Sequence, residues 1–134
     1  MGPNIAVLII DDEPSVADAL GIILRDHGYD VVIAGTGREG LEVAITRRFD
    51  VTITDLRLPD MSGLEVLSQI KQEDPSSQVI VITAYGTPEA VADSMRLGAV
   101  QVLAKPFLPV EVLNLIRKCA ERAVELQRET TNRS

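Results

Sequence analysis

The chain has 134 residues, of which 46% are hydrophobic, and this suits a single globular domain with a substantial core. Its formal net charge of −7 disfavours nucleic-acid backbones and acidic membranes, so we expect no direct nucleic-acid binding by this chain, whereas cations and basic partner surfaces are favoured. The single cysteine, Cys119, excludes an internal disulfide and a cysteine-based zinc site, which fits a reducing cytosol.

The first strand is predicted over residues 5–10, a continuous aliphatic run typical of a strand covered on both faces. This run is too short to cross a bilayer, and no basic segment precedes it as a signal peptide requires. We therefore expect a cytoplasmic protein without membrane contact. The run ends in Asp11 and Asp12, and Pro14 then suits the start of a helix that stops at Gly28.

The following segments repeat this alternation of strand and helix. A short strand is expected over residues 30–34 and a helix over residues 38–48. The next strand, over residues 51–55, is β-branched and buried in character and ends abruptly in Asp55. A third helix begins near Leu64 and is closed by Asp74 and Pro75.

Two further strands also end in residues that can do chemistry. The strand over residues 78–82 leads into Thr83, and the strand over residues 100–104 leads into Lys105. The helix between them starts at Pro88, and we expect its buried stripe to consist of Val91, Ala92 and Met95.

Five strands alternating with five helices and joined by short connections predict an α/β fold, a doubly wound parallel sheet with helices on both faces. Periodicity does not give the strand order. If the order is 2-1-3-4-5, the topological switch falls between the first and third strands, and Asp11, Asp12 and Asp55 converge in one crevice.

The chemistry expected at this edge follows from its donor atoms. Clustered carboxylates repel one another unless they take up protons or share a cation, and an all-oxygen set favours a hard ion such as Mg²⁺. Lys105 would add a fixed positive charge and Thr83 a hydroxyl donor, which together suit a tetrahedral anion. An aspartate in such a setting can act as the nucleophile of phosphoryl transfer and form an aspartyl phosphate.

The chain resembles the receiver domain of bacterial two-component response regulators over residues 5–125. The resemblance is carried by four segments in order: IIDDE with Asp11 and Asp12, ITDLRLPDMSGLE with Asp55, VITAYG with Thr83, and the KPF triplet that begins with Lys105. The chain looks most like receivers of nitrogen-regulatory, enhancer-binding transcription activators in two segments, TAYGTPEAVADSMRLGA and KPF.

The resemblance implies a flavodoxin-like fold and a phosphorylation switch. It makes Asp55 the acceptor of a phosphoryl group from a sensor histidine kinase, with Mg²⁺ held by Asp12, Asp55 and the backbone carbonyl of Arg57, and Asp11 acting through water. Thr83 would bond a phosphoryl oxygen and Lys105 would pair with the phosphate. It also implies a cis peptide before Pro106, and an output through the surface of the fourth helix, fifth strand and fifth helix to an effector domain or a dimer partner.

Three positions raise further hypotheses. Receivers usually carry an aromatic residue or histidine three residues before the lysine, and here that position is Val102, so we hypothesise damped switching through Thr83, or a response by Tyr85 or Leu103 instead. The alternative is that valine simply packs its pocket. Arg57 and Tyr85 stand where the family tunes hydrolysis, and we expect large side chains there to screen the attacking water; otherwise both are merely exposed loop residues.

The last helix is expected from Pro109 to about residue 129, and we assign residues 1–125 to the receiver domain and residues 126–134 to a polar tail or the start of a linker to an absent effector domain.

Two other functions compete with the switch. A Mg²⁺-dependent phosphohydrolase of similar fold is disfavoured because Arg57 stands where a second catalytic acid would be needed. A phosphorylation-independent interaction module would bind no Mg²⁺. Because the chain itself is the substrate, we expect a switch and not a turnover enzyme.

Overall fold

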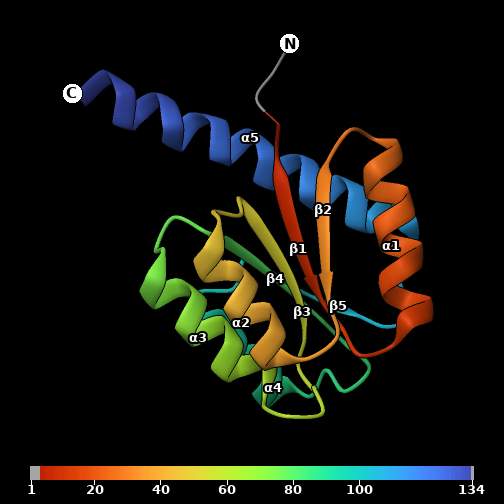
Figure 1. The fold of residues 1–134 in the computed structure, drawn as a ribbon. Coiled ribbons are helices and arrows are strands. Elements are labelled where there is room, and N and C mark those ends of the chain that lie inside the picture. Colours follow the sequence, from red (N-terminus) through yellow and green to blue (C-terminus); the bar gives the residue numbers. More distant parts are fainter. Residues whose placement is uncertain (1–3, 134) are drawn as a thin grey trace.

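The computed structural model describes residues 4–133, with side chains through residue 126. Its centre is a parallel sheet in the order β2-β1-β3-β4-β5, as Figure 1 shows. The strands are β1 (Ala6–Ile10), β2 (Asp30–Ala34), β3 (Val51–Asp55), β4 (Gln78–Thr83) and β5 (Gln101–Ala104). The helices of the described part are α1 (Pro14–Asp26), α2 (Gly37–Thr46), α3 (Gly63–Glu73), α4 (Pro88–Arg96) and α5 (Pro109–Arg133). The predicted fold class and the strand order considered for it are confirmed.

The sheet is covered on both faces by separate apolar clusters. Side chains of α1 and α5 pack against one face together with Val7, Ile9 and Ile53. Side chains of α2, α3 and α4 pack against the other face together with Leu8, Ile10 and neighbours from β4. Every residue of β1, β3 and β4 is buried, which explains why these strands read as continuous apolar or β-branched runs without alternation.

Most predicted boundaries agree with the structure, and the ends of α2 and α5 are the exceptions. Helix α2 ends at Thr46, two residues before the predicted end, because Arg47 is extended with φ −156°. The guanidinium of Arg47 pairs with Asp30 at 2.8 Å and lies 4.8 Å from the centre of the Phe49 ring. These contacts draw the side chain toward β2 and the sheet instead of along the helix.

The predicted buried stripe of α4 was wrong. Val91 and Met95 are 36% and 46% exposed, and the residue of α4 that is fully buried is Ser94. Ser94 donates its hydroxyl to the Ala90 carbonyl at 2.7 Å, which satisfies its polar group inside the helix. The helix therefore lies with its small residues toward the sheet and leaves its larger apolar side chains at the surface.

The last helix is anchored to the sheet along one stripe and then extends beyond it. Val112, Ile116, Cys119 and Ala123 are buried, and the side-chain amide of Gln78 donates to the Cys119 carbonyl at 2.5 Å. The helical backbone continues through residue 125 to Arg133, past the predicted end (Figure 1). The side chains of the predicted polar tail from residue 127 on, and all of Ser134, lie outside the described residues. Within the described residues no helix is both long and apolar enough to span a bilayer.

Candidate functional site

Three carboxylates meet where β1 and β3 end. Asp11 and Asp12 follow β1 directly and Asp55 is the last residue of β3, the strand that pairs with β1 in the sheet. One carboxylate oxygen from each residue lies within 4.8 Å of the others. Asp11 and Asp55 are buried, whereas Asp12 is exposed to solvent. The sequence-predicted cluster is therefore brought together at one edge of the sheet.

Lys105 directly follows β5, the edge strand two positions from β3, and its side chain extends to this cluster. Its ammonium lies 2.7 Å from Asp55 Oδ2, 3.0 Å from Asp11 Oδ2 and 2.9 Å from Glu13 Oε1. The lysine side chain is 10% exposed. Burial opposes its charged form, but hydrogen bonds to Asp55, Glu13 and Asp11 outweigh that effect and raise the pKa of Lys105 above its ordinary value. The ammonium is therefore a permanent positive charge at neutral pH.

Burial acts on the pKa of the Asp11 carboxyl in the opposite direction from its effect on the Lys105 ammonium. It raises the pKa of Asp11, and this effect is only partly offset by the backbone N–H of Glu13, which donates to Asp11 Oδ1 at 2.9 Å, and by Lys105. Asp55 receives a backbone hydrogen bond as well, from the N–H of Arg57 at 3.1 Å. A cation shared by the three acids would relieve the remaining repulsion, and their all-oxygen donor set fits Mg²⁺.

Thr83 ends β4, the strand on the other side of β3, and lies one residue beyond the partner of Asp55 in the sheet register. Its side chain is fully buried, and its hydroxyl oxygen accepts the backbone N–H of Tyr85 at 3.0 Å. Because that bond uses the oxygen as an acceptor, the hydroxyl proton stays available for donation to another group.

Arg57 and Tyr85 meet above the loops that follow Asp55 and Thr83. The guanidinium carbon of Arg57 lies 3.8 Å from the centre of the Tyr85 ring, a stacked cation–π contact. The two residues line a shallow hollow of about 570 Å³ together with Leu56, Leu64 and Ala90. The peptide between Lys105 and Pro106 is cis, as the resemblance implied.

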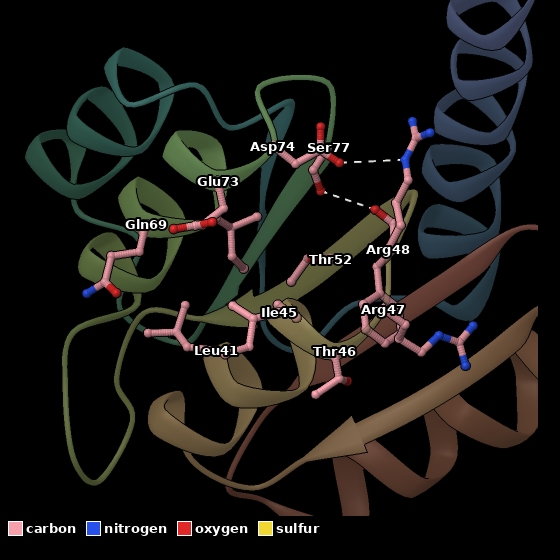
Figure 2. Close-up of a pocket in the computed structure, with 13 residues that line it drawn as sticks. Leu41, Ile45, Thr46, Arg47, Arg48, Thr52, Gln69, Glu73, Asp74 and Ser77 are labelled. Carbon is pink, nitrogen blue, oxygen red and sulfur yellow. Dashed lines mark hydrogen bonds and ion pairs between the residues drawn. The ribbon is translucent and has the colours of Figure 1, made fainter.

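A second hollow, of about 470 Å³, lies between α2 and α3 and shares no residue with the acid cluster (Figure 2). Its walls include Leu41, Ile45 and Ile70, and its rim carries the pair of Arg48 and Asp74 at 3.6 Å. The guanidinium of Arg48 and the carboxylate of Asp74 therefore compensate each other's charge. The chemistry expected from the sequence lies at the acid cluster instead.

Glu13 is the site residue that sequence reasoning did not single out. It stands directly after Asp11 and Asp12, and the third acid in this run was the signal that could have drawn attention to it. Its contact with Lys105 joins residues 92 positions apart in the chain.

The family model for the response regulator receiver domain matches residues 7–117. The chain belongs to the response regulator receiver family. This confirms the resemblance seen in the motifs around Asp11, Asp55 and Lys105.

Relatives and solved structures agree with this assignment. The chain is 37% identical over 104 residues to the transcriptional regulatory protein ZraR of Escherichia coli O157:H7, covering 78% of this chain and 24% of ZraR. It spans between 24% and 52% of the length of three such curated relatives. Several relatives are transcriptional regulatory proteins, in keeping with the expected similarity to receivers of transcription activators.

The fold is likewise that of solved receivers. A CheY-like receiver domain protein from Methanospirillum hungatei JF-1 superposes with a TM-score of 0.89 at 31% identity, covering 92% of this chain and 98% of that one. A chain of the CheX–CheY–BeF₃–Mg²⁺ complex of Borrelia burgdorferi superposes with a TM-score of 0.81 at 28% identity, covering 85% of this chain and 87% of that one.

Proposed function

We propose that this receiver domain is a phosphorylation-dependent switch of a two-component system, in which Asp55 accepts a phosphoryl group from the phosphohistidine of a sensor histidine kinase. The observation that carries the proposal is the Asp55 carboxylate, buried beside Asp11 and held 2.7 Å from the ammonium of Lys105. A nucleophile, a fixed cation and a pair of further acids at one edge of the sheet suit the transfer of a phosphoryl group.

Mg²⁺ would be held by Asp12, Asp55 and the backbone carbonyl of Arg57, with Asp11 acting through water. The cluster of three acids within 4.8 Å supports this set, as does the Mg²⁺ present in the related Borrelia complex. When bound, the ion neutralises charge on the carboxylates and on the transferring phosphoryl oxygens.

In the transfer itself, a carboxylate oxygen of Asp55 forms the new bond to phosphorus while the bond from phosphorus to the donor's histidine nitrogen breaks, and that nitrogen keeps the electron pair. Lys105 donates to a phosphoryl oxygen from its present place beside Asp55. Thr83 donates its free hydroxyl proton to another phosphoryl oxygen, and this requires a small movement of the loop that now holds it through Tyr85. The acceleration of the transfer therefore comes from the positioning of the reacting groups and from the stabilisation of charge on the phosphoryl oxygens.

The same residues argue against turnover. A phosphohydrolase of this architecture needs a second acid two residues after the nucleophile, and that position is Arg57, whose guanidinium stacks on Tyr85. The acyl phosphate on Asp55 is thus the product of one event, and the chain is a self-phosphorylating and self-dephosphorylating switch instead of an enzyme.

Incubation with acetyl phosphate and Mg²⁺, followed by intact mass and inorganic phosphate measurements, separates the three candidate functions. The switch gains one labile phosphoryl group per chain. Release of many phosphates per chain without accumulation of a phosphorylated chain would replace the switch with a phosphohydrolase, and an unlabelled chain that releases no phosphate would leave an interaction module.

We further propose that the signal leaves through the face of α4, β5 and α5, toward an effector domain or a second copy. Val91 and Met95 of α4 and Val100 before β5 are exposed apolar side chains on this face. Residues 1–125 would form the receiver, and the continuation of α5 would begin a linker, because several curated relatives, such as ZraR, are longer than this chain. The acidic chain would work in the cytoplasm without contacting nucleic acid. Sedimentation with and without beryllofluoride tests the dimer: an unchanged monomer would remove that partner.

A further inference from the structure

The Lys105 ammonium nitrogen lies within 3.0 Å of a carboxylate oxygen of Asp11, Glu13 and Asp55, and the three carboxylates have different fates in the proposed switch. Asp55 becomes the acyl phosphate, and Asp11 belongs to the acids that would serve the cation. Glu13 takes neither role. Resting on the proposed function, we propose that Glu13 is a positioning residue, the one partner that holds Lys105 in place before and after phosphorylation.

The backbone around Glu13 is fixed on both sides. Its N–H donates to Asp11 Oδ1 at 2.9 Å, and its carbonyl accepts the N–H groups of Val16 and Ala17 at 3.1 and 3.0 Å. Glu13 is thus the residue that starts α1. Because the backbone of Glu13 is already fixed, the contact with Lys105 costs only the conformational entropy of the Glu13 side-chain rotamers.

The residue type at this position also points to a task other than starting the helix. Ser, Thr, Asp or Asn at this place would accept a backbone N–H of the first turn, and they are the preferred residues there. The Glu13 carboxylate makes no such bond. It lies 2.9 Å from the Lys105 ammonium instead, across the sheet edge.

The simpler interpretation is an exposed ion pair of little consequence, because the Glu13 side chain is 54% exposed. Two facts weigh against it. The partner, Lys105, is 10% exposed, and its other two contacts are with Asp55 and Asp11, whose charges are engaged when the site works. Once phosphorus is bonded to Asp55, Glu13 is the remaining full carboxylate charge free to keep the ammonium aimed at the phosphoryl oxygens.

The test uses Glu13→Gln, which keeps the size of the side chain and removes its charge. Glu121→Gln is the matched control, because Glu121 is an exposed glutamate far along α5. The first readout is the NMR signal of the Lys105 ammonium in the metal-free protein, assigned with Lys105→Arg. Burial and three close carboxylates slow its exchange with water, so we expect a resolved signal in wild type and in Glu121→Gln that broadens away in Glu13→Gln.

The second readout is the rate constant of phosphorylation by acetyl phosphate at saturating Mg²⁺. We expect it to fall about two- to fivefold in Glu13→Gln and to stay unchanged in Glu121→Gln. A Glu13→Gln protein that keeps both the ammonium signal and the wild-type rate would overturn the inference. Wild-type protein that takes no label would overturn the proposed function instead, while the NMR comparison would still report on the contact between Glu13 and Lys105.

Discussion

The stack of Arg57 on Tyr85 predicts that these two side chains control the lifetime of the phosphoryl group as one unit. They come from the loops that follow Asp55 and Thr83, and their mutual contact, at 3.8 Å from guanidinium carbon to ring centre, joins the two loops. If both screen Asp55 from water, replacing either by alanine opens the screen and also frees the other. Dephosphorylation should therefore accelerate in Arg57→Ala and in Tyr85→Ala.

The magnitude follows from the contact. Tyr85 is 54% exposed, and a cation–π contact at an exposed site contributes about 0.5–1 kcal/mol. That free energy corresponds to a factor of about two to five in rate, since about 1.4 kcal/mol is tenfold. We expect each single variant to shorten the lifetime by about this factor, and the double variant to shorten it hardly further, with a coupling energy of about 0.5–1 kcal/mol.

The assay is the release of inorganic phosphate after rapid removal of the donor, measured for wild type, both alanine variants and the double variant. Tyr85→Phe keeps the aromatic face and should keep the coupling to Arg57. Dephosphorylation rates that are the same in all four proteins would refute the screen. Single effects that multiply fully in the double variant would show that the two residues act separately.

Three further outcomes are expected. Burial raises the pKa of the Cys119 thiol to about 11, and the side chain is 1% exposed, so a thiol reagent at pH 8 should modify it only after urea unfolds the protein; rapid reaction of the folded protein would contradict the packing of α5. Hydrogen bonds from the backbone N–H of Arg38, and then from that of Gly37, lower the pKa of Asp60 in the folded protein. The stability that the Asp60 carboxylate contributes is therefore present above the unfolded pKa of about 3.9 and is lost as pH falls through the lower folded pKa. Urea midpoints at pH 6 and pH 3 should therefore differ less in Asp60→Asn than in wild type, and an equal difference would refute this. Because Val102 stands where receivers usually carry an aromatic residue, beryllofluoride should shift amide NMR signals over residues 89–102 less in wild type than in Val102→Tyr, and equal shifts in the two proteins would contradict damped switching.

The fold could be predicted because its signals are local. Aliphatic runs such as that of β1 and stop residues such as Gly28, which has φ 89°, mark each element without reference to the rest of the chain. The acid cluster also followed, since the carboxyl ends of adjacent parallel strands meet at one edge. Asp11, Asp12, Asp55, Thr83 and Lys105 are all found there.

The remainder depended on packing that periodicity does not encode. In α4, Val91 and Met95 fit one helical stripe and Ala90 and Ser94 fit another, and the sheet selected the smaller pair. The contact of Glu13 with Lys105 crosses the sheet edge and has no local signature. Such choices are decided by the fit between surfaces far apart in sequence.

The identity of the acceptor is the central claim, and chemical trapping tests it most directly. The protein is phosphorylated with acetyl phosphate and Mg²⁺ and then treated with borohydride, which reduces an acyl phosphate to an alcohol, and the modified residue is located by peptide mass spectrometry. We predict homoserine at position 55 in wild type, and none in a parallel sample of Asp55→Asn. Homoserine at position 11 or 12, or undiminished labelling of Asp55→Asn, would contradict the account.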